Sequence, residues 1–403
     1  MRVLIADKLA ESVTDALEQS GHDFSVEPNL KDESLVSKLR ELNPNVLVVR
    51  STKVREEHIE AAPGLSAIIR AGAGTNTIDV VAASNRGIYV TNCPGKNAIA
   101  VAELTMGHLI NCDRRISDNV ASLRSHQWAK KAFSKARGLH GRNLAVLGCG
   151  QIGREVISRA LSFGMSVRAW SRSLTPEMAR ELGVTHAATP LEACQGADAL
   201  TVHLALNDAT RSLVGRELLE ALAPGAYIIN TSRGELIDQP VLEELITARN
   251  LRAGLDVFAE EPGANDTTFD YPIADNPAVY GTHHIGASTT QASEAVGAEV
   301  VRIIDVLQSE GRAPNCVNIA DQTPATHTLV VRHADRVGVL ASVLTHVREE
   351  GINVAEMENI IFRGSAACAR IQLTGSPTDS LLEKLNTSPD IFAASIVAME
   401  ARS

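Results

Sequence analysis

The sequence predicts an α/β fold in which two parallel-sheet lobes are followed by a small βαββαβ unit. Short β-rich segments alternate with amphipathic helical segments from the N-terminus to about residue 310, as in parallel sheets covered by helices. A glycine-rich turn joins a strand directly to a helix at residues 148–153. Residues 316–327 are polar and contain Pro324, which predicts a linker, and residues 328–403 carry strand and helix signals in the βαββαβ order.

The first lobe is predicted from short apolar strands, each followed by turn residues and a helical segment. These strands are residues 3–6, 46–49 and 67–69. Residues 98–110 are almost all apolar or small, which predicts a helix that is buried nearly all round and connects two lobes. Residues 287–308 predict a long helix that packs back on the first lobe. We therefore expect a discontinuous first lobe, residues 1–97 and 287–315, and a second lobe, residues 98–286.

The second lobe contains the most specific motif of the chain. A strand at residues 144–147 runs into Gly148-x-Gly150-x-x-Gly153, and a helix and another strand follow. In such a turn the first glycine allows the tight bend, the second lets the backbone approach a pyrophosphate, and the third permits close helix–strand packing. The anion then lies at the helix N-terminus. The motif predicts a Rossmann-like lobe that binds a dinucleotide.

The end of the next strand bears on which nicotinamide cofactor binds. NAD sites usually place an acid about 20 residues after the glycines, where it binds the ribose hydroxyls. This chain instead has Trp170-Ser171-Arg172-Ser173. No carboxylate repels a 2′-phosphate here, and Arg172 supplies a cation, so these residues favour NADP over NAD. The alternative is that Arg172 points to solvent.

Composition argues against several classes of partner. The formal net charge of −10 and an aromatic content of 3% do not suit nucleic acids or anionic membrane surfaces. Charged residues near the N-terminus argue against a signal peptide. The lack of an apolar run of about 18 residues argues against a membrane span. The six cysteines are scattered, without a C-x-x-C motif or metal-binding spacing. We expect a cytoplasmic protein with reduced cysteines and no metal site.

Polar segments follow three later strands and should meet at one edge of the sheet. They are residues 230–234, 256–262 and 282–286. Ligands of open α/β sheets bind at that edge. An arginine there can hold a carboxylate through two hydrogen bonds, and a histidine oriented by an acid can take a hydroxyl proton as hydride leaves carbon. The pattern predicts a dehydrogenase of a small 2-hydroxy acid.

Four segments together resemble the D-isomer-specific 2-hydroxyacid dehydrogenases. They are GCGQIG at 148–153, NTSRGELID at 230–238, GLDVFAEEP at 254–262 and HHIGAST at 283–289. The resemblance implies a catalytic triad of Arg233, Glu261 and His284, because the family's histidine directly precedes an apolar residue and a glycine. Family precedent favours NAD. The glycine motif, the strand end after it and the family segments together give the expected cofactor-binding residues: Gly148, Gly150, Gln151, Ile152, Gly153, Ser171, Arg172, Thr231 and Asp256.

Segments at residues 50–54, 70–74 and 92–97 resemble the branch of this family that acts on 3-phosphoglycerate. The resemblance implies that the glycine loop around Gly72 binds the substrate carboxylate. It also implies that Arg50 and Arg70 bind the phosphate, aided by Lys131 from a neighbouring subunit. The expected reaction is NAD(P)-dependent oxidation of 3-phosphoglycerate to 3-phosphohydroxypyruvate, the first step of serine synthesis. Two alternatives are a hydroxypyruvate or glyoxylate reductase, which the strand end at Arg172 favours, and an NAD(P)-sensing corepressor of the same fold.

The last part of the chain resembles an ACT domain, the small-molecule sensor found in related dehydrogenases. The similarity lies in HADRVGVL at 333–340 and GINV at 351–354. It implies a regulatory domain over residues 328–403 that binds an effector, L-serine in relatives, at a subunit interface through His333, Asp335 and Asn353. It also implies a homodimer or homotetramer. The alternative is an ACT unit that only builds the dimer.

Overall fold

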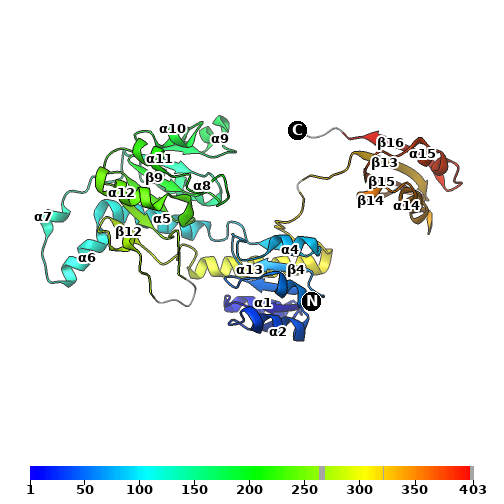
Figure 1. Cartoon of the computed structure of the whole chain (residues 1–403), viewed down its shortest axis with the longest axis horizontal. Helices are drawn as coiled ribbons and strands as arrows, with labels where there is room; N and C mark the ends of the chain where they lie inside the picture. Colours follow the sequence, from blue (N-terminus) through cyan, green and yellow to red (C-terminus); the bar gives the residue numbers. More distant parts are fainter. Residues whose placement is uncertain (263–267, 321, 400–403) are drawn as a thin grey trace. The chain divides into compact units, whose positions relative to one another are not determined.

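The computed structural model describes residues 1–262, 268–320 and 322–399. It contains three β-sheets in two compact units, Met1–Asn318 and Ile319–Ser403 (Figure 1). The predicted α/β class is confirmed, because two of the sheets are wholly parallel and their strands alternate with helices. Over the described ranges, no helix combines the length and apolarity needed to cross a membrane.

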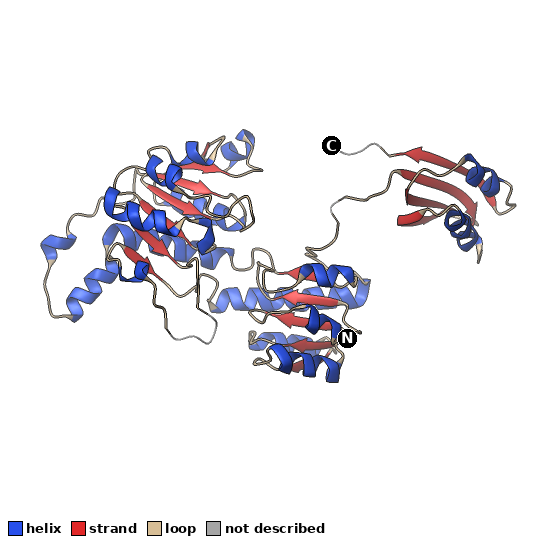
Figure 2. Cartoon of the chain, in the orientation of Figure 1, coloured by secondary structure: helices blue, strands red, loops and turns tan. Residues whose placement is uncertain are grey.

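The five-stranded sheet of the first unit has the order β2-β1-β3-β4-β5. Its strands are β1 (Arg2–Ile5), β2 (Asp23–Val26), β3 (Val46–Val49), β4 (Ala67–Arg70) and β5 (Tyr89–Asn92). Helices α2 (Asp32–Leu42), α3 (Glu56–Glu60) and α4 (Val80–Asn85) contribute to one apolar core, and α1 (Glu11–Gln19) and α13 (Thr290–Glu310) to the other. Both faces of this sheet are therefore covered (Figure 2).

Helix α13 returns to the five-stranded sheet from the far end of the first unit. The Thr289 side chain accepts a hydrogen bond from the Ala292 N–H at 3.1 Å and caps the helix, and Gly311, with φ +68°, follows its last residue. Val300, Ile303 and Ile304 of α13 are fully buried in the core that also contains β1. The helix begins three residues later than the sequence predicts, where the threonine cap can act.

The seven-stranded sheet has the order β12-β11-β10-β9-β6-β7-β8 and is parallel throughout. Its strands are β6 (Asn143–Leu147), β7 (Ser166–Trp170), β8 (Thr185–His186), β9 (Ala199–Val202), β10 (Tyr227–Asn230), β11 (Arg252–Leu255) and β12 (Val279–Gly281). The order reverses between β6 and β9, which is where ligands bind in such sheets. The glycine motif follows β6 at this position.

Helices cover both faces of the seven-stranded sheet as well. One face carries α5 (Ala98–Arg114), α8 (Gln151–Ser162) and α9 (Pro176–Glu181), and the other carries α10 (Pro190–Cys194), α11 (Arg216–Ala221) and α12 (Gln239–Arg249). Two short helices, α6 (Ile116–Arg124) and α7 (Lys130–Phe133), lie in the connection from α5 to β6. Helix α5 is buried along most of its length, as its apolar sequence predicts.

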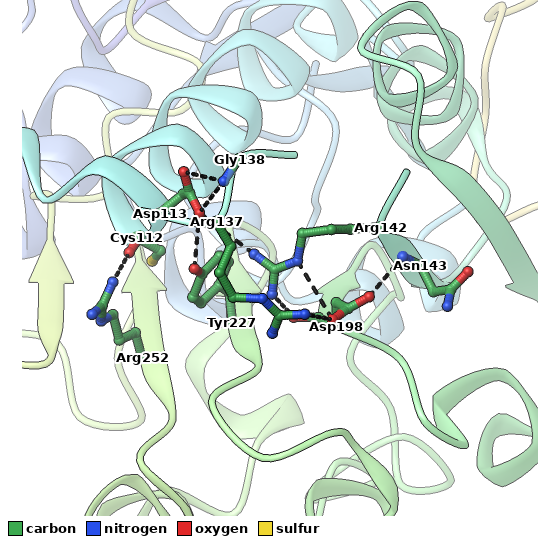
Figure 3. A network of polar contacts seen from close by, with 9 residues as sticks. All are labelled: Cys112, Asp113, Arg137, Gly138, Arg142, Asn143, Asp198, Tyr227 and Arg252. Atoms are coloured by element: carbon green, nitrogen blue, oxygen red, sulfur yellow. Dashed lines mark hydrogen bonds and ion pairs between the residues drawn. The ribbon is translucent and has the colours of Figure 1, made fainter. Parts of the chain in front are cut away.

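A buried polar network attaches the C-terminal end of α5 to this sheet (Figure 3). Asp113 is 2% exposed and accepts hydrogen bonds from the Gly138 N–H at 3.1 Å and the Tyr227 hydroxyl at 3.0 Å. The buried Arg142 guanidinium lies between Asp113 and Asp198, 3.5 Å from each. Because a buried carboxylate requires such partners, these contacts fix where α5 ends relative to β6 and β10.

The second unit has the strand order β14-β15-β13-β16 and is antiparallel. Its elements are β13 (His327–Ala334), α14 (Val339–Glu349), β14 (Asn353–Ile361), β15 (Ala366–Thr374), α15 (Asp379–Asn386) and β16 (Ile391–Ala398). This is the predicted βαββαβ order. Side chains of α14 and α15 cover one face of the sheet and form its apolar core.

The predicted linker at residues 316–327 differs from the structure at both ends. Cys316 pairs with Thr91, and the Val317 N–H donates to the Val90 carbonyl at 2.8 Å, so this stretch lies along β5. The Asn318 side chain accepts from the Val90 N–H at 2.8 Å. At the other end, β13 already begins at His327. Strand β5 lies at the edge of its sheet, so the sheet leaves some of its backbone groups unpaired. Residues 316–318 bond to these groups, which explains why the first unit continues to residue 318.

Candidate active site

Arg233 lies in the loop after β10, which is hydrogen-bonded to the ends of β9 and β10 and packs against the loop at Phe258. The Asn230 side chain donates to the Arg233 carbonyl at 2.8 Å, and the Ser232 hydroxyl donates to the Val202 carbonyl at 2.8 Å. A Cβ on the next residue, Gly234, would lie 1.9 Å from the carbonyl carbon of Phe258, so only glycine allows this approach. The Arg233 guanidinium reaches the glycine loop after β4, since its Nη2 lies 2.8 Å from the position of a Cβ on Gly74.

His284 and Glu261 form a hydrogen-bonded pair, as the resemblance implies. The distance from His284 Nδ1 to Glu261 Oε2 is 2.7 Å, and the Phe258 N–H donates to Glu261 Oε1 at 3.2 Å. Burial raises the pKa of Glu261, but the hydrogen bond from His284, its charge and the Phe258 N–H outweigh burial and lower that pKa overall. The carboxylate therefore stays ionised and directs Nε2 of the imidazole away from itself.

Asp256 holds the loop that carries His284. It is 1% exposed, and its Oδ1 accepts from the Thr282 hydroxyl at 2.6 Å and the Ile285 N–H at 2.9 Å. Its Oδ2 accepts from the Gly286 N–H at 2.8 Å. These contacts give Asp256 a structural role in the loop, and its expected contact with the cofactor stays a prediction.

Arg50 and Arg70 lie near Arg233 at the carboxyl ends of β3 and β4. Burial and the positive charges of Arg233 and Arg50 lower the pKa of Arg70 below its usual value. Its Nε is buried without a hydrogen-bond partner among the described residues. Within those residues none of the three arginines forms an ion pair. The arrangement therefore concentrates positive charge that suits a bound anion.

Asp7 positions Arg50, and the sequence analysis did not identify it. The carboxylate Oδ2 accepts from the N–H groups of Arg50 at 2.6 Å and Thr52 at 3.0 Å, and Oδ1 accepts from the Ser51 hydroxyl at 2.8 Å. Asp7 stands just beyond β1, at the same sheet edge as Arg50. That strand-end position was the available signal, since acids there can bind the loop after the neighbouring strand.

Gly72 lies directly under the Arg70 side chain. Its φ is +151°, and a Cβ would lie 1.5 Å from Arg70 Nη1. The Gly72 N–H donates to the Arg70 carbonyl at 2.8 Å, so this group is already used. The Asn92 side chain donates to the Ala73 carbonyl at 2.6 Å and holds the rest of the loop against Arg233.

The glycine motif has the geometry of a dinucleotide turn. Gly148 has φ +101°, and a Cβ on Gly153 would lie 2.0 Å from the Gly148 carbonyl oxygen, which explains both glycines. At Gly150 no described atom lies within 4 Å of a Cβ position, so that backbone stays open to a ligand. Helix α8 begins there without a side-chain cap from any described residue, which leaves its first N–H groups for an anion.

The other expected cofactor residues lie around this turn. The Gln151 side chain extends to Gly95, where a Cβ would lie 1.2 Å from Gln151 Oε1, and Ile152 packs against the core under α8. Thr231 is 7% exposed, and its hydroxyl is 2.9 Å from that of Thr105. Ser171 and Arg172 follow β7, where Arg172 is exposed and forms no ion pair with any described residue. The strand end thus contains no carboxylate facing a 2′-phosphate.

Lys131 is not brought to this site within one chain. It lies on α7, is exposed, and makes no hydrogen bond to Arg50, Arg70 or Arg233 in the described ranges. The expected contribution from a neighbouring subunit stays a prediction.

The three expected effector residues do not converge within one copy of the second unit. Asn353 pairs with Thr374 at one end of β15, whereas His333 pairs with Ala367 near the other end, about 23 Å away at the rise of a β-strand. His333 is 2% exposed and hydrogen-bonded to the Ala334 carbonyl and to Asn359. Only Asp335 and Asn353 are exposed. One copy of this unit does not bring the three side chains together, so the expected effector site at a subunit interface stays a prediction.

Comparison with known proteins agrees with this geometry. Residues 106–314 match the model of the D-isomer specific 2-hydroxyacid dehydrogenase NAD-binding domain. The chain is 36% identical to D-3-phosphoglycerate dehydrogenase of Methanocaldococcus jannaschii over 93% of its own length and 69% of the relative's. It is 38% identical to hydroxypyruvate reductase of Thermotoga maritima over 75% of its length and 97% of the relative's.

A solved structure of NAD+-bound 3-phosphoglycerate dehydrogenase from Entamoeba histolytica is also similar. It superposes with a TM-score of 0.65 and 26% identity, over 79% of this chain and 99% of that one. The chain spans 64 to 69% of the length of two phosphoglycerate dehydrogenases that it matches. The sequence match, which covers more than half of the chain, and the paired His284 and Glu261 lead to one conclusion: this chain belongs to the D-isomer specific 2-hydroxyacid dehydrogenase family.

Proposed function

We propose that this enzyme oxidises 3-phosphoglycerate to 3-phosphohydroxypyruvate, with Arg233, Glu261 and His284 as its catalytic residues. The observation that carries the proposal is the group of three arginines, Arg50, Arg70 and Arg233; burial, and then the charges of Arg233 and Arg50, lower the pKa of Arg70. A substrate with a carboxylate at one end and a phosphate at the other supplies two anionic groups to such a site. The named relatives at 36% identity support the same substrate.

Each substrate group has a proposed partner. Arg233, next to the glycine loop at Gly74, binds the carboxylate, and Arg50 and Arg70 bind the phosphate. Asp7 holds the loop of Arg50 in place through backbone N–H groups. The three guanidinium groups come from three different strand ends. They therefore orient the substrate as well as balance its negative charge.

In the proposed mechanism, His284 acts as the general base. Its Nδ1–H donates to Glu261 Oε2, so Nε2 is free to accept the proton of the C2 hydroxyl. Glu261 then stabilises the imidazolium that forms. A nicotinamide cofactor, when bound, supplies the hydride acceptor. Gly150 and the uncapped N-terminus of α8 fit its pyrophosphate, because that backbone is open to a ligand on its exposed side.

We propose that NADP is accepted through Ser171 and Arg172, although the family resemblance alone favours NAD. The end of β7 has no acid to bind the ribose hydroxyls or to repel a 2′-phosphate. Arg172 is exposed and close in sequence to the position where such a phosphate binds in NADP enzymes.

A second candidate is a hydroxypyruvate or glyoxylate reductase. The observation that favours it is the 38% identity to a hydroxypyruvate reductase over 97% of that relative's length. The two candidates differ in their need for the phosphate-binding arginines, since glyoxylate and hydroxypyruvate carry only a carboxylate.

Initial rates of the purified enzyme separate the two candidates. The panel contains 3-phosphoglycerate, D-glycerate, hydroxypyruvate and glyoxylate with each cofactor. We expect the highest kcat/KM with 3-phosphoglycerate, and we expect Arg70→Ala to lower it about 100-fold with little effect on the other acids. Equal or higher kcat/KM with hydroxypyruvate, together with an indifferent Arg70→Ala variant, would establish the reductase instead.

The second unit, by its ACT resemblance, is proposed to be regulatory, and the enzyme to be a homodimer or homotetramer. An effector site that uses Asp335 and Asn353 requires two copies of this unit, because the register of the sheet separates the two residues. L-serine is the effector to test, by initial rates and by calorimetry.

A further inference from the structure

His108 on α5 lies beneath the loop that carries His284. It is 4% exposed, and α5 packs against β11 so closely that a Cβ on Gly254 would lie 2.7 Å from the Cβ of His108. Its Nε2 is 3.0 Å from the hydroxyl of Thr282, which begins the His284 loop. A buried histidine with a single polar contact to a catalytic loop calls for a physical explanation.

The direction of the hydrogen bonds follows from the groups involved. Asp256 Oδ1 is an acceptor, so the Thr282 hydroxyl donates its single proton to that oxygen, at 2.6 Å. The Thr282 oxygen can then only accept, and His108 must donate to it from Nε2–H. Burial lowers the pKa of His108, and this neutral form carries its one proton on Nε2. The chain His108–Thr282–Asp256 is therefore directional.

Asp256, the last member of this hydrogen-bonded series, determines the backbone conformation around His284. Asp256 accepts from the N–H groups of Ile285 and Gly286, and its carbonyl accepts from the His284 N–H at 2.8 Å. His284 itself has φ +51°, a conformation that costs a non-glycine residue free energy and persists only where its surroundings impose it. Asp256 is the group that imposes it, and Thr282 and His108 orient Asp256.

We propose that His108 is a positioning residue for the dehydrogenase reaction, which holds His284 in its reactive orientation through Thr282 and Asp256. This inference rests on the proposed role of His284 as the base. His108 touches neither substrate nor cofactor in this scheme. Its Nε2–H prevents the Thr282 hydroxyl from rotating away from Asp256. The loop backbone is then held in place by its hydrogen bonds to the Asp256 carboxylate.

The test compares two substitutions of His108. If His108 acts as a hydrogen-bond donor, His108→Leu lowers kcat more than His108→Gln does; if it acts only by packing, the order is reversed. His108→Leu keeps an apolar side chain of similar size in a buried position but removes the donor. His108→Gln places an amide N–H near the position of Nε2. We expect kcat to fall about tenfold in His108→Leu with KM unchanged, because Arg233 still binds the substrate, and to stay within about twofold in His108→Gln.

A second pair of variants tests the middle of the chain. Thr282→Val should lower kcat about as much as His108→Leu, and Thr282→Ser should retain it. The double variant His108→Leu/Thr282→Val should be no slower than either single variant, because both remove the same device. Thermal unfolding of each variant separates loss of fold from loss of orientation.

The proposal is overturned if His108→Leu turns over normally, or if Leu and Gln lower kcat equally in proportion to a loss in Tm. His284→Ala, measured in parallel, keeps the two hypotheses apart. If His284→Ala retains turnover, the proposed function fails. If His284→Ala is inactive while His108→Leu is normal, only the positioning role fails.

Discussion

Glu261 and Asp256 act on His284 in different ways. Glu261 bonds to its imidazole at Nδ1, whereas Asp256 bonds to the backbone of its loop. One carboxylate determines which ring nitrogen carries the proton, and the other determines where the ring lies. A base in this reaction needs both, since proton transfer depends on tautomer and distance together.

Substitution of Glu261 tests the first of these effects. Glu261→Gln should lower kcat by about 100-fold or more, because the neutral amide does not stabilise an imidazolium and permits the other tautomer. KM should change little, since Arg233 is untouched. Steady-state rates with saturating cofactor measure both constants. A variant that keeps kcat within about twofold of the native value contradicts the assignment of the pair.

Arg172 is the residue on which cofactor preference is expected to depend. Arg172→Ala should lower kcat/KM for NADP about tenfold and leave that for NAD nearly unchanged, because only NADP carries a 2′-phosphate. Arg180→Ala is a matched control, since Arg180 is an exposed arginine on the nearby α9 that pairs with Glu177. If Arg172→Ala lowers kcat/KM equally with both cofactors, Arg172 does not read the 2′ position.

The extent to which single residues could be predicted depended on whether their partners are local. Gly148, Gly150 and Gly153 act within one turn, so their spacing suffices to identify them. Asp7 acts on a loop 43 residues away along the chain, a pairing that only the sheet order creates. The apolar pattern of α5 gave no reason to single out His108. The hydrogen bonds from the His284 loop to Asp256 could not be predicted either, because they join residues 26 to 30 positions apart.

At the scale of elements, Glu299 joins α13 to the segment that leads into α5. It is 6% exposed and accepts from Arg302 at 2.6 Å and Asn315 at 2.7 Å, and it pairs with Lys96 at 3.2 Å. These contacts, the Arg302 hydrogen bond foremost, lower the pKa of Glu299 from 4.5 to about 2. Lys96 lies in the first crossover between the two parallel sheets, and α13 follows the second.

Replacement of Glu299 should give a pH-dependent loss of stability. A folded-state pKa below the unfolded value means that the stabilisation is complete above pH 4.5 and disappears as pH falls towards 2. Glu299→Gln should therefore cost about 1–3 kcal/mol at pH 7, and this difference from the native protein should shrink below pH 4.5. Urea unfolding at a series of pH values measures it.

Glu310→Gln is the control for Glu299. Glu310 ends the same helix and pairs with Arg312, but its side chain is 48% exposed, so its loss should cost no more than about 0.5 kcal/mol. Equal destabilisation by both substitutions would contradict the role given to Glu299.

The order and type of the elements were predictable because apolar runs and strand-end turns are local signals. The sequence predicts both parallel sheets, the buried α5 and the returning α13. It misplaced the start of the linker, because the polar residues 316–318 pair with an edge strand. The antiparallel register also places His333 and Asn353 near opposite ends of β15, so only two copies of the unit can combine them in one site. Register depends on long-range pairing, which residue types alone do not reveal.

For the molecule as a whole, the division into two units predicts separable behaviour. Residues 1–318 contain every proposed catalytic and cofactor-binding residue, and each unit has its own apolar core. Calorimetry should therefore resolve two unfolding transitions. A protein truncated after Asn318 should show only one of these two unfolding transitions. It should also retain kcat with 3-phosphoglycerate within about threefold. A single transition, or loss of activity on truncation, would mean that the second unit is needed to complete the first.

The return of α13 to the five-stranded sheet bears on how the chain is made. The N-terminal amine donates to the Gln308 side chain at 3.0 Å across 307 residues of sequence, and Val300 and Ile304 complete the core around β1. At the usual pace of translation, about 5–20 residues per second, this helix emerges from the ribosome roughly 15–60 s after β1. The sheet whose first strand is synthesised first is thus finished only after the uninterrupted nucleotide lobe, which can close beforehand. Nascent chains stalled before residue 290 should expose the apolar face of β1 and β3 to chaperones.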